Sequence, residues 1–393
     1  MAGRTAFIPG PLRTHPARTA VAAGGAAAVL VIAAVLTAGL SHPGASHRGA
    51  RARLAASTCS GPAGAAYVSD SGWDGFSAID TATCQVVQTY NVGDTQVPGD
   101  AGDYNYSSTN EGIAVSGGNL YFADTGTSNV AVIATSSLDP SNYNPPEQLI
   151  NVGLFPQDVA VTPDGKQVWV AETGPQTSPS SPSGVSVIST ASDQVTAHLP
   201  VGGQPSQVAF SPSGAVAYVV TAEGLWLFST ATEKPAGVIH GLGDPRGIVV
   251  SPDGSTLYVT DTQAGTVAVI NAATRAVTHT IKVGQLPWQL AISPNGQTLY
   301  VANPDSDSVS VIDTAANRVT HTISVTGDPD TLALTPNGQQ LWIGQSTAAF
   351  VTVLDIATDT TVGSINLGGP TPQSGDGYEP TGIALVSTPT AGS

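Results

Sequence analysis

The sequence predicts an all-β fold, a seven-bladed β-propeller of four-stranded blades, and three observations lead to that fold class. A strand motif that opens on an aromatic residue occurs seven times, at intervals of 40 to 54 residues. A tight-turn sequence containing proline and glycine precedes five of these motifs. The first repeat lacks its first strand, and a segment after the last repeat supplies one. Repeats of this period made of short strands are typical of propeller blades.

The strand motif joins an aromatic residue to β-branched and small neighbours, a composition that favours strands. Its seven copies begin at Tyr67, Tyr121, Trp169, Tyr218, Tyr258, Tyr300 and Trp342. The turns before five of them span Thr162–Gly165, Ser211–Gly214, Ser251–Gly254, Ser293–Gly296 and Thr335–Gly338. In such turns Pro presets φ and Gly accepts a positive φ, so each turn joins two adjacent strands closely.

Residues 247–284 form the clearest repeat, and it contains the four strand-like segments GIVV, TLYVTD, TVAVIN and AVTHTIKV. Turn residues separate these segments, as expected for a four-stranded antiparallel sheet. One such sheet cannot bury both of its faces alone. Sheets stacked around a ring bury each other, so the repeats are expected to form a single propeller.

The two ends of the repeat region predict how the ring closes. The region begins at Ala65–Asp70, a second strand with no first strand before it, and ends at Gly382–Val386, a first strand with no blade after it. Pairing of these two segments completes the seventh blade and removes an exposed sheet edge. The innermost strands are then expected to start near Gly112, Asp158, Gln207, Gly247, Gln289, Thr331 and Gly382.

The repeat resembles the YVTN family of β-propellers, because it carries YVTD at Tyr258, YVAN at Tyr300 and repeated SPDG-type turns. The resemblance covers roughly Ala65 to Val386. It implies a seven-bladed fold common in surface-layer and other extracytoplasmic proteins. It implies no single activity, since a fold does not fix a function.

The N-terminal region is typical of an exported protein. Residues 1–18 form a basic n-region, and residues 19–40 are an uncharged run, TAVAAGGAAAVLVIAAVLTAGL. As a helix this run would reach ~33 Å, enough to cross a bilayer. It is interpreted as a cleaved signal peptide or a retained transmembrane anchor, and both stay open. Residues 41–64 follow as a linker, 65–386 as the propeller and 387–393 as a tail.

Charge is divided unevenly along the chain. The first 53 residues hold six of the 12 basic residues and no acidic residue, so residues 54–393 hold six basic and 28 acidic residues. Such an acidic domain repels polyanions, which excludes nucleic acid as an expected partner and limits membrane contact to the N-terminal segment. We therefore expect an extracytoplasmic monomer, secreted or tethered by that segment. Its expected partner is a protein, peptide or glycan of the cell envelope.

The only two cysteines are Cys59 and Cys84, both in or near the first repeat. An even pair in an exported chain predicts one disulfide bond, here joining the entry of the domain to the loop before Gln85. Two cysteines alone do not make a metal site, so no metal ligands are predicted.

Motifs of catalysis and cofactor binding are absent from the sequence. It contains no Walker loop, no dinucleotide-binding fingerprint, no haem attachment motif and no G-x-S-x-G nucleophile sequence. Four histidines fall in predicted fourth strands on the outer rim, where they cannot converge on one metal: His198, His240, His279 and His321. No catalytic residue and no cofactor are therefore predicted.

Two connections between blades are longer than the others, residues 93–111 and 368–381, and they flank the closing blade. We expect them side by side on one face of the ring, where they bring together Asp103, Tyr104, Tyr106, Glu111, Tyr378 and Glu379. Carboxylates suit Ca²⁺ or a basic ligand, and tyrosine rings suit sugars or peptides. The alternative is that these loops are solvated and only cover the closure seam.

The mouth of the central channel is the second candidate site. The residues just before the inner strands are Glu111, Gln157, Ser206, Arg246, Trp288, Asp330 and Thr381. Arg246 is the only cation among them, and Trp288 holds the equivalent position in the next blade. The two residues are candidates for a cation–π pair or for gripping a carboxylate, and a structural role is the alternative. Asp158 and Asp330 complete the candidate ligand-binding residues.

The function predicted from these features is a non-catalytic binding scaffold that recognises its partner through the face bearing loops 93–111 and 368–381. The alternative is a propeller hydrolase or lyase, similar to a lactonase, with carboxylates and a divalent metal at the channel mouth. Its only suitable acids are Glu111, Asp158, Asp330 and Glu379.

Overall fold

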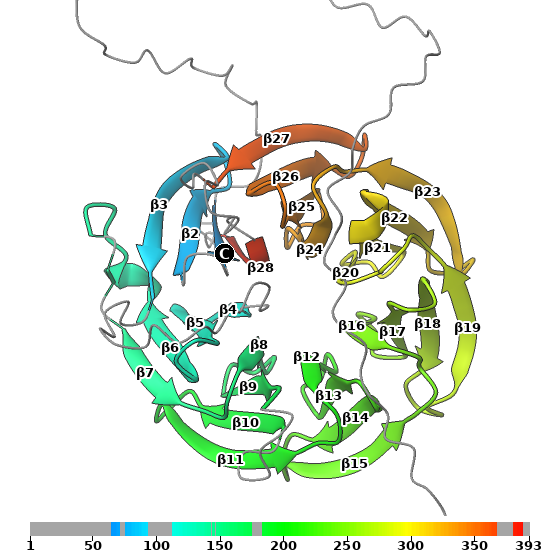
Figure 1. The fold of residues 1–393 in the computed structure, drawn as a ribbon, viewed down its shortest axis with the longest axis horizontal. Coiled ribbons are helices and arrows are strands. Elements are labelled where there is room, and N and C mark those ends of the chain that lie inside the picture. The colour runs from blue at the N-terminus through cyan, green and yellow to red at the C-terminus, as the bar shows by residue number, and fades with distance from the viewer. Residues whose placement is uncertain are drawn as a thin grey trace, which may run out of the picture. The chain divides into compact units, whose positions relative to one another are not determined.

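The computed structural model describes residues 64–70, 75–92, 112–142, 144–145, 147–174, 183–367 and 380–387. In these residues 28 strands form seven four-stranded antiparallel sheets, which surround a common centre (Figure 1). The prediction of an all-β, seven-bladed propeller is confirmed.

Each blade runs from an inner strand at the channel to an outer strand at the rim. The closing blade contains β28 (Pro380–Ser387), β1 (Gly64–Asp70), β2 (Gly75–Asp80) and β3 (Gln85–Asn91). The next blade contains β4 (Ile113–Ser116), β5 (Asn119–Asp124), β6 (Asn129–Ala134) and β7 (Gln148–Asn151). It is followed by β8 (Pro156–Val161), β9 (Gln167–Glu172), β10 (Gly184–Ser189) and β11 (Gln194–Pro200).

The other four blades follow in chain order. They contain β12 (Pro205–Phe210), β13 (Val216–Thr221), β14 (Gly224–Ser229) and β15 (Lys234–Ile239), then β16 (Pro245–Val250), β17 (Thr256–Asp261), β18 (Thr266–Asn271) and β19 (Val277–Lys282). The last two contain β20 (Leu290–Ile292), β21 (Thr298–Asn303), β22 (Ser308–Asp313) and β23 (Arg318–Ser324), then β24 (Pro329–Leu334), β25 (Gln340–Gln345), β26 (Phe350–Asp355) and β27 (Thr360–Asn366). Two 3₁₀ turns, η1 (Thr135–Ser137) and η2 (Pro304–Ser306), complete the described elements.

The ring closes in the way that the sequence predicts. Strand β28 pairs antiparallel with β1, and Val68 lies opposite Ile383. Figure 1 shows the red β28 beside the blue strands of the same blade. The side chains of Ser69 and Thr381 also contact each other, with their hydroxyl oxygens 3.2 Å apart. The inner strand of this blade therefore comes from the far end of the chain.

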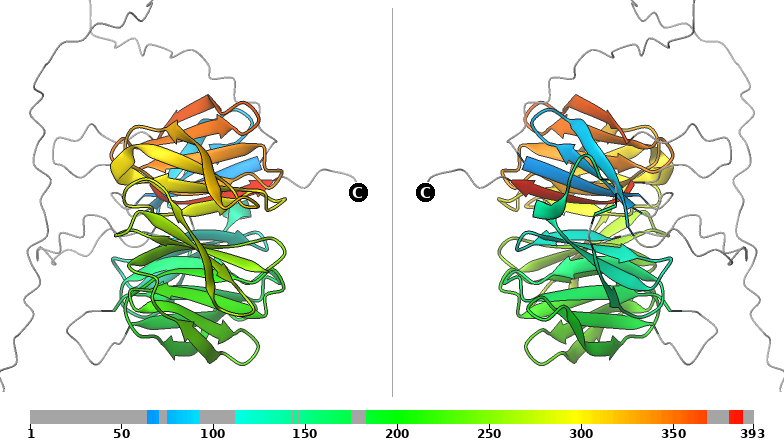
Figure 2. Two further views of the ribbon diagram at one scale, coloured as in Figure 1. Left: turned by 90° about the vertical axis from the view of Figure 1, so that its right-hand side faces the viewer. Right: turned by 90° about the vertical axis from the view of Figure 1, so that its left-hand side faces the viewer.

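The hydrophobic core lies between neighbouring blades rather than at the centre of the ring. One core cluster joins Leu225 and Leu227 of β14 to Ile248 and Leu257 of the following blade. The second strand of a blade is buried along almost its whole length, as in β25, because it lies between two other blades as well as inside its own sheet. In the side views the sheets stack face to face around the ring (Figure 2).

The proline–glycine turns join the first and second strands as the sequence predicts. In the turn at Ser251–Gly254, the amide of Gly254 donates to the carbonyl of Ser251 at 2.8 Å, and Gly254 has φ +73°. The Ser251 hydroxyl oxygen accepts the amide of Thr256 at 2.9 Å and donates to Asp253. The turn therefore fixes its own geometry through the side chains of its first and third residues.

The last residue of the strand motif holds the connection that enters its blade. The Glu172 carboxylate accepts the amide of Gly153 at 2.8 Å, and Asp261 accepts the amide of Asp244 at 3.2 Å. In a third blade the carbonyl oxygen of the Asn303 side chain accepts an amide of the corresponding connection at 3.1 Å. This role fits the polar residue that ends the motif in all seven repeats.

Several expectations fall on residues outside the described ranges. They include the n-region, the apolar run 19–40, Cys59 and most of the two long loops. Cys84 is buried, but its predicted disulfide partner is not described, so the Cys59–Cys84 bond stays a prediction. In the part of the chain that the structure describes, no helix is long and apolar enough to cross a membrane.

Candidate functional site

A proline and a β-bulge open each of five inner strands at the channel. In β12, Pro205 pairs with Thr221 and Gln207 with Val220, so Ser206 between them has no partner in the ladder. The same shift isolates the residue after the first proline in β8, β24 and β28, and in β16 both Arg246 and Gly247 lack a partner in the ladder. A bulge turns a side chain out of the regular pleat. The residues turned out in this way are Gln157, Ser206, Arg246, Asp330 and Thr381.

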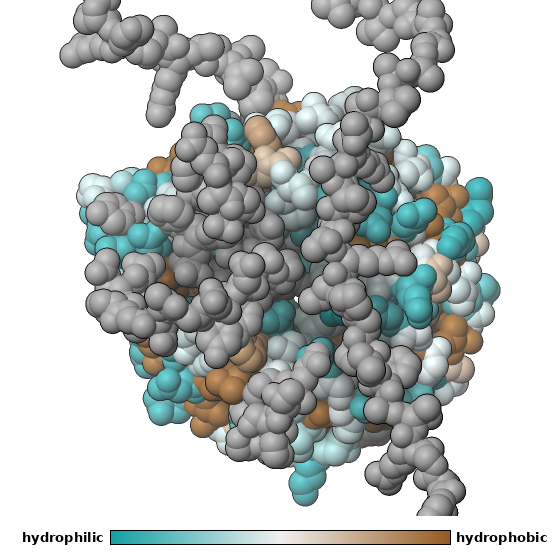
Figure 3. Space-filling model, in the orientation of Figure 1, coloured by the Kyte–Doolittle hydropathy of each residue, from teal (hydrophilic) through white to brown (hydrophobic). Residues whose placement is uncertain are grey.

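Four of these residues, all except Asp330, line a cavity of about 200 Å³ at the mouth of the channel, to which all seven blades contribute. Its polar lining includes Gln157, Asp158, Ser206, Gln207, Gln289 and Thr381. Arg246 and Trp288 add one guanidinium and one indole to the same wall. Teal residues are visible near the centre of the ring in the space-filling view (Figure 3). A concave site with a few converging polar groups is the usual form of a ligand site.

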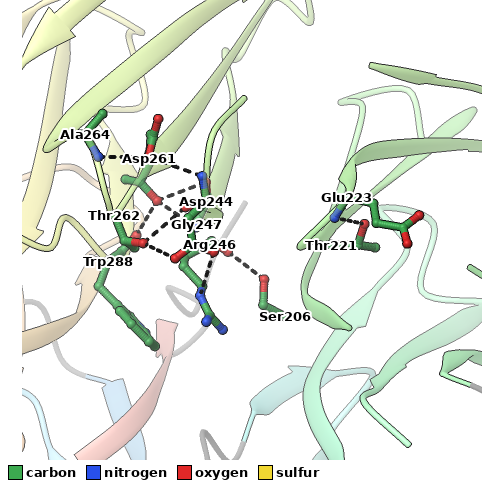
Figure 4. A network of polar contacts seen from close by, with 11 residues as sticks. Ser206, Thr221, Glu223, Asp244, Arg246, Gly247, Asp261, Thr262, Ala264 and Trp288 are labelled. Atoms are coloured by element: carbon green, nitrogen blue, oxygen red, sulfur yellow. Dashed lines mark hydrogen bonds and ion pairs between the residues drawn. The ribbon is translucent and has the colours of Figure 1, made fainter. Parts of the chain in front are cut away.

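Arg246 is held in place by two neighbours (Figure 4). Its guanidinium carbon lies 5.3 Å from the centre of the Trp288 ring. Its Nε lies 3.9 Å from the Oδ1 of Asp244, and the Oδ2 of Asp244 accepts the hydroxyl of Thr262 at 2.5 Å. The terminal nitrogens of Arg246 point away from Asp244 (Figure 4), and among the described residues neither has a hydrogen-bond partner.

The amide side chains of the cavity wall bond neighbouring blades together. The Oε1 of Gln207 accepts the amide of Ile248 at 2.7 Å. The Oε1 of Gln289 accepts the amide of Leu332 at 3.2 Å and the hydroxyl of Thr331 at 3.0 Å. A backbone N–H needs an acceptor, so these bonds fix which end of each amide is oxygen.

Asp158 holds the position equivalent to Gln207 and makes the same bond. Its Oδ2 accepts the amide of Val208 in the next blade at 2.9 Å. Burial raises the pKa of the Asp158 carboxyl to about 6, and the bonds from the Val208 and Val159 amides oppose that rise. The group therefore stays protonated to a higher pH than an ordinary aspartate.

Gly247 follows Arg246 at a place where two neighbouring blades approach closely. A Cβ on Gly247 would lie 2.2 Å from the carbonyl oxygen of Trp288. The hydroxyl of Thr260 bridges the two, accepting the amide of Gly247 at 2.8 Å and donating to the Trp288 carbonyl at 2.9 Å. A glycine at this position thus allows Trp288 to approach Arg246.

The structure brings only some of the predicted site residues together. Arg246, Trp288 and Asp158 line one cavity, whereas Asp330 is not among its lining residues. The remaining candidates lie outside the described residues, and their roles stay predictions: Asp103, Tyr104, Tyr106, Glu111, Tyr378 and Glu379.

A buried acid on the side of the blade β8–β11 was not anticipated from the sequence. Glu172 is 1% exposed, and its Oε2 lies 3.5 Å from the Nε2 of His198. The Nδ1 of His198 lies 2.8 Å from the hydroxyl oxygen of Ser186. Burial raises the pKa of the Glu172 carboxyl, while bonds from Ser186 and Gly153 and the nearby His198 oppose that rise.

This Ser–His–Glu set does not form an accessible nucleophile, because Ser186 is fully buried. The signal for it was present in the sequence: Ser186 pairs with His198 across β10 and β11, and Glu172 ends the motif strand beside them. The histidines lie at the rim as expected, except that His240 follows β15 by one residue. Among the described residues, no three His, Cys, Asp or Glu side chains form a group able to hold a metal ion.

Comparison with known proteins identifies the fold. Residues 216–337 match the model of the YNCE-like β-propeller family. The hydrazine synthase of Kuenenia stuttgartiensis superposes with a TM-score of 0.59 at 20% identity, covering 73% of this chain and 98% of that one. A functionally unknown protein from Desulfotomaculum acetoxidans DSM 771 superposes with a TM-score of 0.63 at 15% identity, covering 82% of this chain and 98% of that one.

Similarity at these identities describes architecture and not activity. A search of curated proteins gives no match to the sequence. The predicted family resemblance is supported at the level of a β-propeller, whereas the narrower YVTN assignment stays a prediction. The chain is thus a seven-bladed β-propeller with a YNCE-like stretch at residues 216–337.

Proposed function

We propose that this protein is an extracytoplasmic, non-catalytic binding scaffold whose ligand enters the mouth of the central channel. The observation that carries the proposal is the cavity of about 200 Å³ at that mouth, to which every blade contributes side chains. Its partner would be a protein, peptide or glycan of the cell envelope. The basic, apolar N-terminal region and the YVTN-like repeats support the extracytoplasmic location.

Two features favour binding over catalysis at this cavity. Its most polar side chains are engaged in fixed bonds between blades, as Gln207 and Gln289 are. Arg246 is preorganised by Trp288 and Asp244, which lowers the entropy that a ligand must overcome to bind it. The long loops 93–111 and 368–381 belong to the proposal on sequence grounds, as an extension of the binding face beyond the cavity.

A cavity-filling variant tests this proposal. Ser206 lies on the cavity wall, so Ser206→Trp should fill the space and abolish capture of defined ligands on peptide and glycan arrays. Ser213→Trp is the matched control, because Ser213 is exposed in the turn at Ser211–Gly214 and does not line the cavity. Both variants should keep a cooperative thermal transition. Array binding that survives Ser206→Trp would remove the cavity from the proposal.

The alternative proposal is a propeller hydrolase or lyase, similar to a lactonase, and the raised pKa of Asp158 favours it. A carboxyl with a pKa of about 6 suits general acid–base work near neutral pH. Such an enzyme needs a divalent metal or a second acid at the same mouth. Elemental analysis of stripped and reloaded protein tests this: one tightly bound ion per chain favours the enzyme, and none favours the scaffold.

A further inference from the structure

The cavity wall offers hydrogen-bond donors, because most of its acceptors are already occupied. The Oε1 atoms of Gln207 and Gln289 accept backbone amides of the next blade. The carbonyl oxygen of Arg246 accepts the hydroxyl of Ser206 at 2.9 Å, and that of Trp288 accepts the hydroxyl of Thr260. On these residues the groups that remain for a ligand are N–H donors, while Gln157 and Asp158 lie elsewhere on the wall and carry acceptor oxygens.

Two amide groups and one guanidinium supply these donors. Since the Oε1 of each glutamine accepts a backbone N–H, the opposite end of each side chain is an NH₂ group. Among the described residues, neither of these nitrogens has a hydrogen-bond partner. The terminal nitrogens of Arg246 are likewise open, while its Nε is directed to Asp244 (Figure 4). These donors lie on three consecutive blades and favour a ligand group that accepts hydrogen bonds.

We propose that the cavity binds the terminal carboxylate of a peptide, with Arg246 as its carboxylate receptor and Gln207 and Gln289 as donors to the neighbouring peptide oxygens. This rests on the proposed function of the cavity as a ligand site and names the chemistry of the ligand. A carboxylate presents two acceptor oxygens in one plane, which matches the two terminal nitrogens of a guanidinium.

The same wall suits a sugar less well. Sugar hydroxyls both donate and accept, so they need free acceptors, and those of Gln207 and Gln289 are occupied. A sugar ring also stacks on an aromatic face, but the Arg246 guanidinium covers one face of the Trp288 indole. Among the described lining residues the one carboxyl is that of Asp158, two blades away from Arg246, where it would accept peptide N–H groups and repel the carboxylate toward Arg246.

A pair of probes that differ only at the carboxylate tests the proposal. Acetyl-triglycine acid and its carboxamide are titrated into the full-length protein by calorimetry. The acid should bind at least tenfold more tightly, as expected for a charge-assisted bond. Arg246→Gln should weaken binding of the acid by about 10- to 100-fold. Lys166→Gln is the control, since Lys166 is exposed beside the turn at Thr162–Gly165 and should leave affinity unchanged.

An isosteric change separates donor loss from misfolding. Gln289→Glu keeps an acceptor for the Leu332 amide but replaces the NH₂ group with a charged oxygen, so it should weaken the acid probe while the thermal transition is retained. Equal binding of the acid and the carboxamide overturns the proposal, as does full binding by Arg246→Gln.

A third probe distinguishes the source of the carboxylate. If glucuronate binds in an Arg246-dependent way and acetyl-triglycine acid does not, the ligand is an acidic glycan and the peptide proposal fails. If array ligands are lost in Ser206→Trp but show no preference for a carboxylate, the cavity is still the ligand site. In that case the proposed function stands and only the carboxylate inference fails.

Discussion

At the scale of single residues, the glycine that ends each proline–glycine turn contacts the turn of the preceding blade. Gly338 has φ +68°, and a Cβ there would lie 2.8 Å from the Cδ of Pro294. Gly296 faces Pro252 in the same way at 3.2 Å. The turns therefore pack in series around the ring, and their glycines serve both the turn and the contact between blades.

Replacement of Gly338 should cost more than backbone strain alone. Gly338→Ala adds the strain of a positive φ, about 1–2 kcal/mol, and the clash with Pro294. Gly117→Ala is the matched comparison, because Gly117 has φ +60° but no atom within 4 Å of its Cβ position. Urea unfolding should show the larger loss for Gly338→Ala. Equal losses would mean that the contact with Pro294 relaxes freely.

The raised pKa of Asp158 makes stability depend on pH. The folded protein holds a proton up to about pH 6 that the unfolded chain releases near its ordinary value of 3.8. Stability from this group is therefore greatest below pH 3.8 and falls as pH rises to about 6, by at most ~3 kcal/mol. Asp158→Asn, which keeps an oxygen for the Val208 amide, should remove that part of the pH dependence in urea unfolding between pH 4 and pH 7.

Asp164 provides a control of opposite sign. Bonds from Thr162 and Lys166 lower the pKa of the exposed Asp164 carboxyl to about 2. Its small contribution to folding stability is thus present above pH 3.8 and is lost as pH falls toward 2. Asp164→Asn should therefore leave the pH dependence of stability between pH 4 and pH 7 unchanged. If it changed that dependence as Asp158→Asn does, the effect would not be specific to the buried carboxyl.

At the scale of elements, two pairs of histidine and carboxylate differ in burial. Glu172 is 1% exposed and lies 3.5 Å from His198, whereas Asp359 is 42% exposed and lies 3.0 Å from His321. The pair His321–Asp359 joins β23 to the turn between β26 and β27 of the next blade. The shorter distance belongs to the pair with the exposed carboxylate. Distance and burial of the carboxylate therefore predict opposite orders for the strength of the two interactions.

Burial of the carboxylate should decide which pair contributes more to the free energy of unfolding. In double-mutant cycles with Gln replacing each histidine and Glu172, and Asn replacing Asp359, the pair with the buried carboxylate, His198–Glu172, should couple by about 0.5–1 kcal/mol. The exposed pair should couple by about 0–0.5 kcal/mol. The measurement is the free energy of unfolding in urea near neutral pH. Stronger coupling in the exposed pair would show that solvent screening matters less here than distance.

The sequence predicts the elements of this fold better than the site that they build. The turns and the motif strands could be located because each depends on residues close together in the chain, such as Ser251 and Gly254. The acceptor role of Gln207 could not be predicted, because its partner Ile248 lies 41 residues away in the next blade. The bulges that expose Ser206 and Arg246 were also missed, although the proline before each one marks the place.

At the scale of the whole molecule, the described surface carries few large apolar side chains. Those that are exposed lie in outer strands or connections, namely Val87, Leu149, Leu154, Val195 and Val277. In Figure 3 apolar areas are scattered among polar ones on the visible face. Acidic residues are also in excess over residues 54–393, so the described surface presents isolated apolar side chains in a polar, acidic setting.

Closure by β28 should control the stability of the whole ring. Truncation before Pro380 removes the inner strand of the closing blade and exposes the edge of β1, so the cooperative thermal transition should be lost. Removal of residues 388–393 alone should leave the transition unchanged. Calorimetry measures both. A cooperative transition in the chain truncated before Pro380 would mean that the other six blades are stable without closure of the ring.

The pairing of β1 with β28 also sets the order in which the chain can finish folding. Ser69 and Thr381 are 312 residues apart, so β1 leaves the ribosome long before its partner strand is made. At typical rates of synthesis that interval is roughly 15–60 s. Throughout that interval the closing blade lacks its inner strand, so the ring cannot close until β28 has been made.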